Sequence, residues 1–209
     1  MIRFATPADA AAVRSIYAPF VESTPISFEE TPPTVSEVET RLEETLETYP
    51  WLVCELEGEV VGYAKAGPLR SMAAYEWTVE LSVYIDTAAR RSGVASGLYT
   101  ALLEVLEHQG YHSAYAAITV PNPASDRFHE RMGFEAVGDF PRAGYTEGEW
   151  RDVRWWYRPI GGALSDSDSG TGPDTEPAPD SPTPLSVVMS DSGRDLERAL
   201  AAGEAVLER

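Results

Sequence analysis

The chain has little cysteine, histidine and lysine, and each shortage excludes a class of protein. Its single cysteine, Cys54, excludes an intrachain disulfide, and apolar neighbours predict that it is buried. Three scattered histidines and one cysteine do not make a metal site. No apolar run is long enough to span a membrane, and no signal peptide is recognisable, so we expect a cytoplasmic protein.

Positive charge is scarce as well. Sixteen Lys and Arg residues stand against 34 Asp and Glu residues, the formal net charge is −18, and Lys65 is the only lysine. Nucleic acids and anionic membranes bind basic patches, so neither is expected as a partner. The acidic, lysine-poor composition indicates a halophilic protein, and a merely solubilising surface is the plainer alternative.

Apolar periodicity and turn residues divide residues 1–160 into alternating strands and helices. The helices are predicted over residues 6–20, 35–49, 95–108 and 122–132. The strands are predicted at runs rich in β-branched and aromatic residues, namely 2–5, 51–56, 60–66, 76–85, 112–119, 135–143 and 150–158. This order favours one domain of the α/β (α+β) class with a mixed sheet.

The composition changes after residue 160. Residues 161–184 consist mainly of Gly, Ser, Asp, Thr and Pro, so residues 161–193 are predicted to be a disordered acidic linker. In residues 194–208 the apolar side chains are spaced for a short amphipathic helix, which would be marginally stable alone. Whether this helix docks on the domain or frays is left open by the sequence.

The stretch from residue 80 to residue 134 is the centre of the chain. A strand-like run ends at Ile85, and a loop with Gly93 and Ala95 then opens onto an amphipathic helix. A strand–loop–helix junction aims backbone N–H groups and the positive end of the helix dipole at one point, which suits an anion such as a pyrophosphate. A simple tight turn is the alternative interpretation, since short motifs also arise by chance.

The motif order resembles the GNAT superfamily of acyl-CoA-dependent N-acetyltransferases: strand, Arg-x-x-Gly-x-Ala, helix, strand, Asn122, helix, Gly133-Phe134. The stretches 49–53, 74–80, 121–122 and 148–153 are similar to the phosphinothricin and methionine sulfoximine acetyltransferases. This resemblance implies a GNAT fold, with a mixed, mostly antiparallel sheet of about six or seven strands flanked by about four helices. It also implies acetyl-CoA as co-substrate and a homodimer, since relatives are often dimers.

Two residues are candidates for proton transfer, because an amine must lose a proton to attack a thioester and the leaving thiolate gains one. Glu80 lies between apolar residues of a predicted strand, and the resemblance implies that it is the general base. An outward-facing strand residue is the alternative. His129 matches a histidine with a catalytic part in the resembled family, which implies a proton donor or relay. A structural histidine is the alternative.

The resemblance also implies the cofactor and acceptor contacts. The end of the central strand should pair with pantetheine, the loop amides should hold the pyrophosphate, and an asparagine should contact the carrier. These residues are Val83, Tyr84 and Ile85; Arg91, Ser92, Gly93, Val94, Ala95 and Ser96; and Asn122, which as a helix cap has an alternative role. The acceptor pocket should be lined by Phe28, Tyr75, Trp77 and Trp150.

Two acceptor positions depart from the family pattern. Relatives commonly have Arg and Lys where this chain has Met72 and Thr146. Each lost charged hydrogen bond to an anionic acceptor would cost on the order of 1.5–3 kcal/mol. Arg70 or Arg142 could compensate for this loss.

We therefore predict an N-acetyltransferase that transfers acetyl from acetyl-CoA to the amino group of a small amino-acid-like acceptor. Phosphinothricin or methionine sulfoximine is the expected type, and the acceptor attacks directly in a ternary complex. The alternatives are an acetyltransferase for a polyamine or a protein N-terminus, and a non-catalytic acyl-CoA-binding module. The mechanism requires the pyrophosphate loop and Glu80 to lie on the same side of the sheet.

Overall fold

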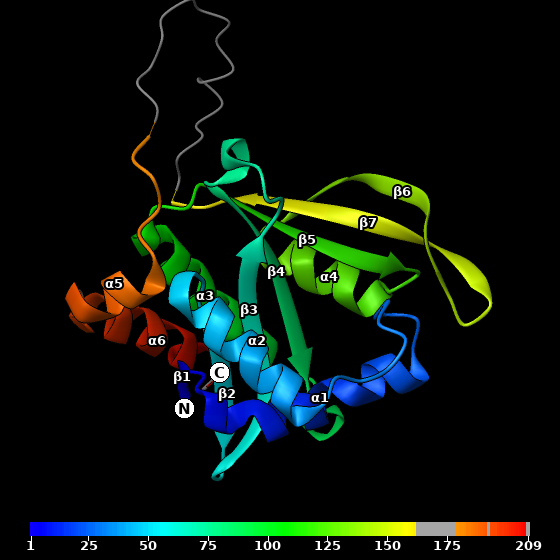
Figure 1. Cartoon of the computed structure of the whole chain (residues 1–209), viewed down its shortest axis with the longest axis horizontal. Coiled ribbons are helices and arrows are strands. Elements are labelled where there is room, and N and C mark those ends of the chain that lie inside the picture. The colour runs from blue at the N-terminus through cyan, green and yellow to red at the C-terminus, as the bar shows by residue number, and fades with distance from the viewer. Residues whose placement is uncertain (162–178, 192, 208–209) are drawn as a thin grey trace, which may run out of the picture.

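The computed structural model describes residues 1–161, 179–191 and 193–207. Seven strands form one sheet in the order β1-β2-β3-β4-β5-β7-β6 (Figure 1). Only β4 and β5 are parallel neighbours, so the predicted mixed, mostly antiparallel sheet is confirmed. The strands are β1 Ile2–Phe4, β2 Trp51–Leu56, β3 Glu59–Pro68, β4 Thr78–Ile85, β5 Ser113–Val120, β6 Glu135–Thr146 and β7 Glu149–Pro159.

Helices cover both faces of the sheet (Figure 1). The helices α1 (Ala10–Ser23) and α2 (Val35–Thr48) lie on one face, and α3 (Val94–Gln109) and α4 (Pro123–Arg131) lie on the other. Short 3₁₀ helices span Pro7–Asp9, Ala73–Tyr75 and Thr87–Ala89. No helix in the described ranges is long and apolar enough to cross a membrane.

The pleat of β4 separates two cores, because successive side chains of a strand point to opposite faces. Leu81 packs under α3 in the larger core, and Tyr84 packs against the smaller core under α1 and α2. The helix α2 starts where the sequence predicts, since the Thr34 hydroxyl accepts a hydrogen bond from the Glu37 amide at 3.2 Å. The carboxylate of Glu37 accepts one from the Thr34 amide at 2.7 Å, which completes a capping box.

The prediction of a disordered linker over residues 161–193 is wrong where the structure describes this segment. Residues 179–184 run along the domain, and the Thr183 amide donates a hydrogen bond to the Gln109 carbonyl at 2.7 Å. They lead into α5 (Leu185–Asp191), whose Leu185 and Val188 are buried against Val105 of α3. Both residues belong to a short apolar stretch, but the sequence does not show that this stretch packs on α3. Residues 162–178 and 192 lie outside the described residues.

The helix predicted over residues 194–208 is present as α6 (Gly193–Leu207), and it docks on α3; residue 208 lies outside the described part. Two glycines allow a very close crossing, since a Cβ added to Gly203 would lie 2.5 Å from the Gly97 carbonyl oxygen. Beside β1, the Glu204 carboxylate accepts a hydrogen bond from the Ile2 amide at 2.8 Å. The described chain therefore has six α-helices, one more than the five predicted, and the additional helix is α5.

Candidate active site

The parallel strands β4 and β5 are paired only at their beginnings. Their ladder starts at Thr78 with Ser113 and ends where Glu80 lies opposite Tyr115. Beyond this point β5 is paired with β7 alone, so the two strands separate. The gap opens into a cavity of about 80 Å³, the strand-gap cavity, lined by residues 81–84, residues 116–119 and side chains of α3 and α4.

This gap fits the predicted contacts with pantetheine. In the described chain, residues 81–85 pair with β3 on one side and with no strand on the other. An unpaired strand edge can hold an extended ligand through its backbone N–H and C=O groups. Val83 and Tyr84 line the strand-gap cavity, whereas the Ile85 side chain packs into the larger core.

His129 lies in the wall of the strand-gap cavity and is only 3% exposed. Its Nδ1 is 2.9 Å from the Ser125 carbonyl oxygen, so Nδ1 carries the proton and donates. Its Nε2 is 3.3 Å from the Tyr99 hydroxyl and accepts from it in the neutral ring. Burial lowers the pKa of His129 and favours this neutral form, although the Ser125 hydrogen bond opposes the shift.

Glu80 is half-buried at the point where the strands separate. It lies opposite Gly67 of β3, and nothing lies within 4 Å of the place where a Cβ on Gly67 would stand. The space beside the carboxylate is therefore open. Burial raises the pKa of Glu80, while the nearby charges of Arg70 and Lys65 oppose the rise. A carboxylate with a raised pKa suits proton abstraction from an amine.

The expectation that Glu80 and the pyrophosphate loop share one side of the sheet is wrong for the side chain. Leu81 faces α3, so its neighbour Glu80 points with Ser82 and Tyr84 to the face of α1 and α2. The loop and His129 belong to the face of α3 and α4. The strand gap joins the two sides, because Ser82, Tyr84 and His129 line one cavity. An acceptor on one face and a carrier on the other can therefore meet there.

The predicted pyrophosphate loop lies at the N-terminus of α3. Gly93 caps this helix with φ 84°, and Arg91 also has a positive φ of 66°. The first amides of a helix have no partner within it and can bind an anion. The residues predicted to hold the pyrophosphate thus lie before the cap, at the cap and in the first turn of α3: Arg91, Ser92, Gly93, Val94, Ala95 and Ser96. A Cβ on Gly93 would lie 3.4 Å from the Val206 carbonyl oxygen, so the end of α6 stands beside this loop.

Two further cavities lie on the face of α1 and α2. The outer cavity, of about 400 Å³, is lined by residues that include Phe28, Thr119 and Val153. The second, which we call the recess, has about 170 Å³ and lies beneath α1 and α2. Tyr84 lines the outer cavity, the recess and the strand-gap cavity, so the three meet at its side chain.

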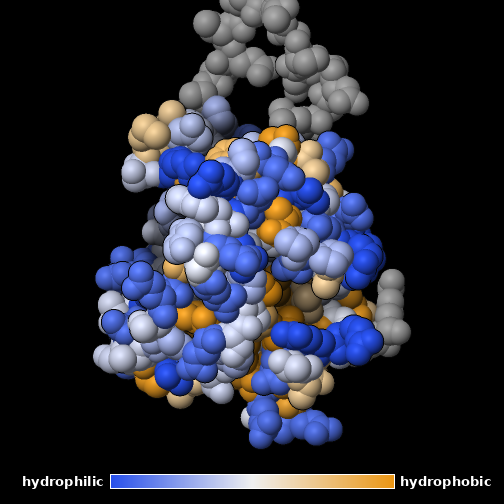
Figure 2. Space-filling model, turned by 90° about the vertical axis from the view of Figure 1, so that its right-hand side faces the viewer, coloured by the Kyte–Doolittle hydropathy of each residue, from blue (hydrophilic) through white to orange (hydrophobic). Residues whose placement is uncertain are grey.

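The predicted acceptor residue Phe28 belongs to the outer cavity. It is 43% exposed, and its ring covers Gly144 of β6, where an added Cβ would come within 2.3 Å of it. Figure 2 shows the side of the molecule that lies on the right in Figure 1, with apolar side chains exposed at the surface. Trp150 and Tyr145, which lie near the end of the β6–β7 hairpin, are among the exposed apolar residues of the chain.

The other predicted acceptor residues do not line these cavities. The Trp77 indole donates a hydrogen bond to the Asp180 carbonyl at 3.0 Å, so the Trp77 side chain points toward the segment of residues 179–184. Met72 and Tyr75 are exposed in the connection before β4, and Thr146 and Trp150 lie in the β6–β7 hairpin. Their contact with an acceptor stays a prediction.

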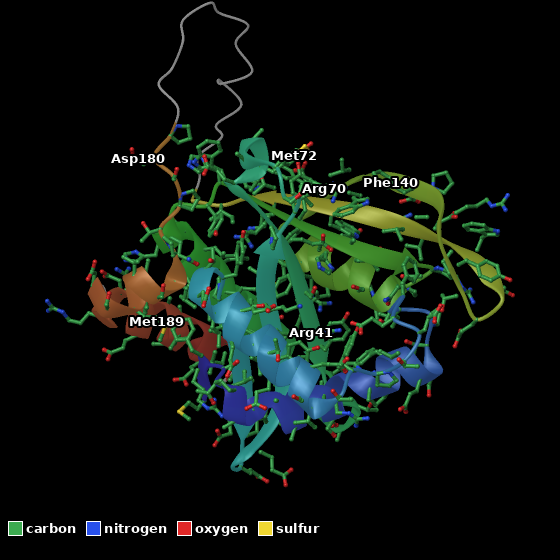
Figure 3. The ribbon with its side chains drawn as sticks, viewed as in Figure 1. Arg41, Arg70, Met72, Phe140, Asp180 and Met189 are labelled. Carbon is green, nitrogen blue, oxygen red and sulfur yellow. The ribbon has the colours of Figure 1, made fainter. Side chains whose placement is uncertain are left out.

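Of the two arginines considered as replacements, Arg70 is near Glu80 and lowers its pKa. The guanidinium of Arg70 lies 5.8 Å from the Trp155 ring, and Figure 3 shows Arg70 and Met72 near one another. Arg142 lies instead over Trp150, 4.9 Å from the ring centre.

Three residues near the candidate site are not singled out by the sequence pattern for this role. Ser125 stands one helical turn before His129, a spacing that could have indicated it. Tyr99 belongs to the apolar stripe of α3, and Lys65 to an alternating strand, so neither gives such a signal. In the described residues, no group of three or more His, Cys, Asp or Glu side chains could hold a metal ion.

The fold is that of known acetyltransferases. The family model of the acetyltransferase (GNAT) domain matches residues 2–155. A phosphinothricin N-acetyltransferase of Streptomyces viridochromogenes is 45% identical over 157 residues, which cover 75% of this chain and 86% of that protein. An L-methionine sulfoximine/L-methionine sulfone acetyltransferase of Pseudomonas paraeruginosa is 36% identical over 154 residues, 73% of this chain and 90% of that protein.

A solved structure supports the same family. It is a GNAT superfamily phosphinothricin acetyltransferase from Sinorhizobium meliloti in complex with AcCoA, with a TM-score of 0.75 and 31% identity. The match covers 85% of this chain and 92% of that one. The chain belongs to the GNAT acetyltransferase family. The predictions of this family, of its fold and of an N-acetyltransferase that uses acetyl-CoA are confirmed.

Proposed function

We propose that the protein transfers the acetyl group of acetyl-CoA to the amino group of a small amino-acid-like acceptor, of the phosphinothricin or methionine sulfoximine type. The observation that carries this proposal is the strand gap, where Glu80 ends the β4–β5 ladder and three cavities meet at Tyr84. The names of the relatives support the acceptor class.

In this proposal the carrier enters the strand-gap cavity from the side of α3 and α4. Its pantetheine pairs with the free edge at Val83 and Tyr84, and its pyrophosphate meets the amides that follow Gly93. Asn122 caps α4 by accepting a hydrogen bond from the Ser125 amide at 3.2 Å, and it also lines the cavity. Both of its expected roles are therefore compatible.

The acceptor amine approaches from the face of α1 and α2. Glu80 accepts the ammonium proton, and the nitrogen lone pair forms a bond to the thioester carbonyl carbon. The carbon–sulfur bond then breaks, and the CoA thiolate leaves and takes up a proton. The raised pKa of Glu80 brings its basicity closer to that of the amine, which makes the first transfer easier.

His129 serves in this proposal as a proton relay rather than as a general acid that is already protonated in the resting enzyme. Its low pKa and its neutral tautomer leave no proton on Nε2 to give away. The Tyr99 hydroxyl, which contacts Nε2, keeps its own proton because burial raises its pKa. In the relay, Nε2 first takes up a proton from the surrounding water, and the proton then passes through the Tyr99 hydroxyl to the thiolate, so both side chains end in their starting protonation states and the buried ring is charged only in passing.

A thiol-release assay with acetyl-CoA tests the proposal across a panel of amines. We expect turnover with phosphinothricin or methionine sulfoximine and little with polyamines or with peptides that present a free N-terminus. Preference for a polyamine or a peptide would favour the rival acetyltransferases. Binding of acetyl-CoA without release of thiol for any amine would favour the non-catalytic binding module.

Three finer expectations accompany this proposal. A homodimer is supported by apolar side chains exposed along β6, among them Val137, Phe140 and Tyr145. The cytoplasmic location and the halophilic character stay predictions from composition. Sedimentation at several protein concentrations would test the dimer.

A further inference from the structure

The recess holds the only lysine of the chain. Lys65 lies on β3, is half-buried, and lines the recess together with Tyr17, Glu29 and Arg41. Its Nζ stands 4.7 Å from the centre of the Trp51 ring, which holds the ammonium at the wall by a cation–π contact. The side chain is thus fixed in a cavity rather than spread on the surface.

The other charges of the recess already have partners. The Arg41 guanidinium donates to both carboxylate oxygens of Glu29, at 2.9 Å and 3.1 Å. The Tyr17 hydroxyl donates a further hydrogen bond to Glu29 at 3.0 Å. Among the described residues, Lys65 has no hydrogen bond and no carboxylate within 4.0 Å. Among these residues Lys65 is therefore a partly desolvated cation without a direct ion pair, and the charges of Glu29 and Glu80 act on it only from a longer distance. Such a group costs free energy until an anion binds to it.

Lys65 and Glu80 are diagonal neighbours on the same face of the sheet. Lys65 is paired with Ser82 and Glu80 with Gly67, so the two side chains project two residues apart on adjacent strands. Their charges influence each other, because Glu80 opposes the burial effect that lowers the pKa of Lys65. Yet the two groups interact only through their charges, without a hydrogen bond between them, and Gly67 leaves open space beside Glu80.

We infer that Lys65 binds the carboxylate of the acceptor and thereby selects amino acids over simple amines. The inference rests on the proposed function, since it assigns the other end of the same acceptor. An α-amino acid carries an ammonium and a carboxylate one carbon apart. The ammonium faces Glu80 and the carboxylate faces Lys65, so one zwitterion gives each of these two side chains a direct partner of opposite charge. The recess has room for a carboxylate, since its volume of about 170 Å³ is at least about ten times the roughly 10–15 Å³ of cavity that one water molecule needs.

This placement also explains how an acceptor site without cations at Met72 and Thr146 can keep an anionic group. A polyamine would instead bring its second ammonium toward Lys65, and like charges repel in a partly buried site. The chemistry of the recess therefore favours an amino acid over a polycation.

The test compares methionine sulfoximine with its α-carboxamide, which keeps the amine and loses the anion. Binding of both is measured by calorimetry with the wild-type protein and with Lys65→Met and Lys65→Arg. We expect the wild type to favour the acid by about ten- to a hundred-fold, as one charged hydrogen bond provides. Lys65→Met should lose this preference through weaker binding of the acid alone, and Lys65→Arg should keep part of it.

Arg194→Met is the matched control, because it removes one positive charge from the exposed surface of α6. It should leave both affinities unchanged. An equal loss for acid and carboxamide in Lys65→Met, or no preference in the wild type, would overturn the assignment. Thiol release with the carboxamide serves as the separate readout of the proposed function. Its presence in Lys65→Met shows that acetyl transfer survives when acid selection is lost.

Discussion

The docking of α6 on α3 predicts an inverted effect for one substitution, Gly203→Ala. In an ordinary helix interior this change stabilises by roughly 0.5–1 kcal/mol, because alanine loses less conformational freedom than glycine. At Gly203 the new methyl group would stand 2.5 Å from the Gly97 carbonyl oxygen and 2.8 Å from the Ala101 Cβ. The first neighbour is backbone and cannot rotate away.

The magnitude follows from the two opposing effects. Overpacking of a close contact typically costs about 1–3 kcal/mol. After the helical gain is subtracted, Gly203→Ala should lower the free energy of unfolding by about 0.5–2 kcal/mol. Because the end of α6 stands beside Gly93, the same shift should also change the KM for acetyl-CoA.

Urea unfolding measures the first effect, and limited proteolysis shows whether α6 has become accessible. Gly193→Ala is the control, since it adds the same methyl group to the same helix where nothing lies within 4 Å. It should stay within about 0.5 kcal/mol of the wild type. A Gly203→Ala protein that is more stable than the wild type would show that α6 does not dock on α3 in this way.

Three further outcomes follow from named contacts. Burial lowers the pKa of His129 in the folded protein. As the pH falls below about 6.5, the unfolded chain therefore binds a proton that the folded protein does not, and the free energy of unfolding decreases. His129→Gln should flatten this decrease in urea unfolding measured at several pH values. Asn122→Ala should cost about 1 kcal/mol through loss of the α4 cap and should raise the KM for acetyl-CoA, whereas Asn122→Ser keeps the cap and isolates the second effect. Arg3 donates two hydrogen bonds at 2.8 Å to Asp9, and they lower the pKa of its carboxyl group. The stability they provide is therefore present above about pH 4 and is lost as the pH falls. Asp9→Asn should cost about 1–3 kcal/mol in thermal unfolding at neutral pH and little in acid.

The elements with strong local signals could be predicted from sequence. The capping box at Thr34 fixes the start of α2, and the tight turn at Gly58 fixes the β2–β3 hairpin, since both depend on neighbours in the chain. The apolar neighbours of Glu80 also indicated its burial. Such features need no knowledge of distant contacts.

The features that were missed depend on tertiary contacts. Only the packing of α3 and α4 on the sheet brings Tyr99 beside His129, and only the sheet register makes Lys65 a diagonal neighbour of Glu80. The prediction of a disordered linker over residues 161–193 failed for a related reason. The burial of Leu185 against α3 joins residues far apart in sequence, and local composition does not show it.

The pH dependence of kcat/KM with and without the Glu80 carboxylate tests the acetyl-transfer mechanism most directly. In the wild type, kcat/KM should rise with pH as Glu80 loses its proton at a pKa above its usual value. In Glu80→Gln the rate should fall by at least about 100-fold and this acidic limb should disappear, while the affinity for acetyl-CoA stays the same. Near-normal turnover in Glu80→Gln, with the same acidic limb, would contradict its role as the base.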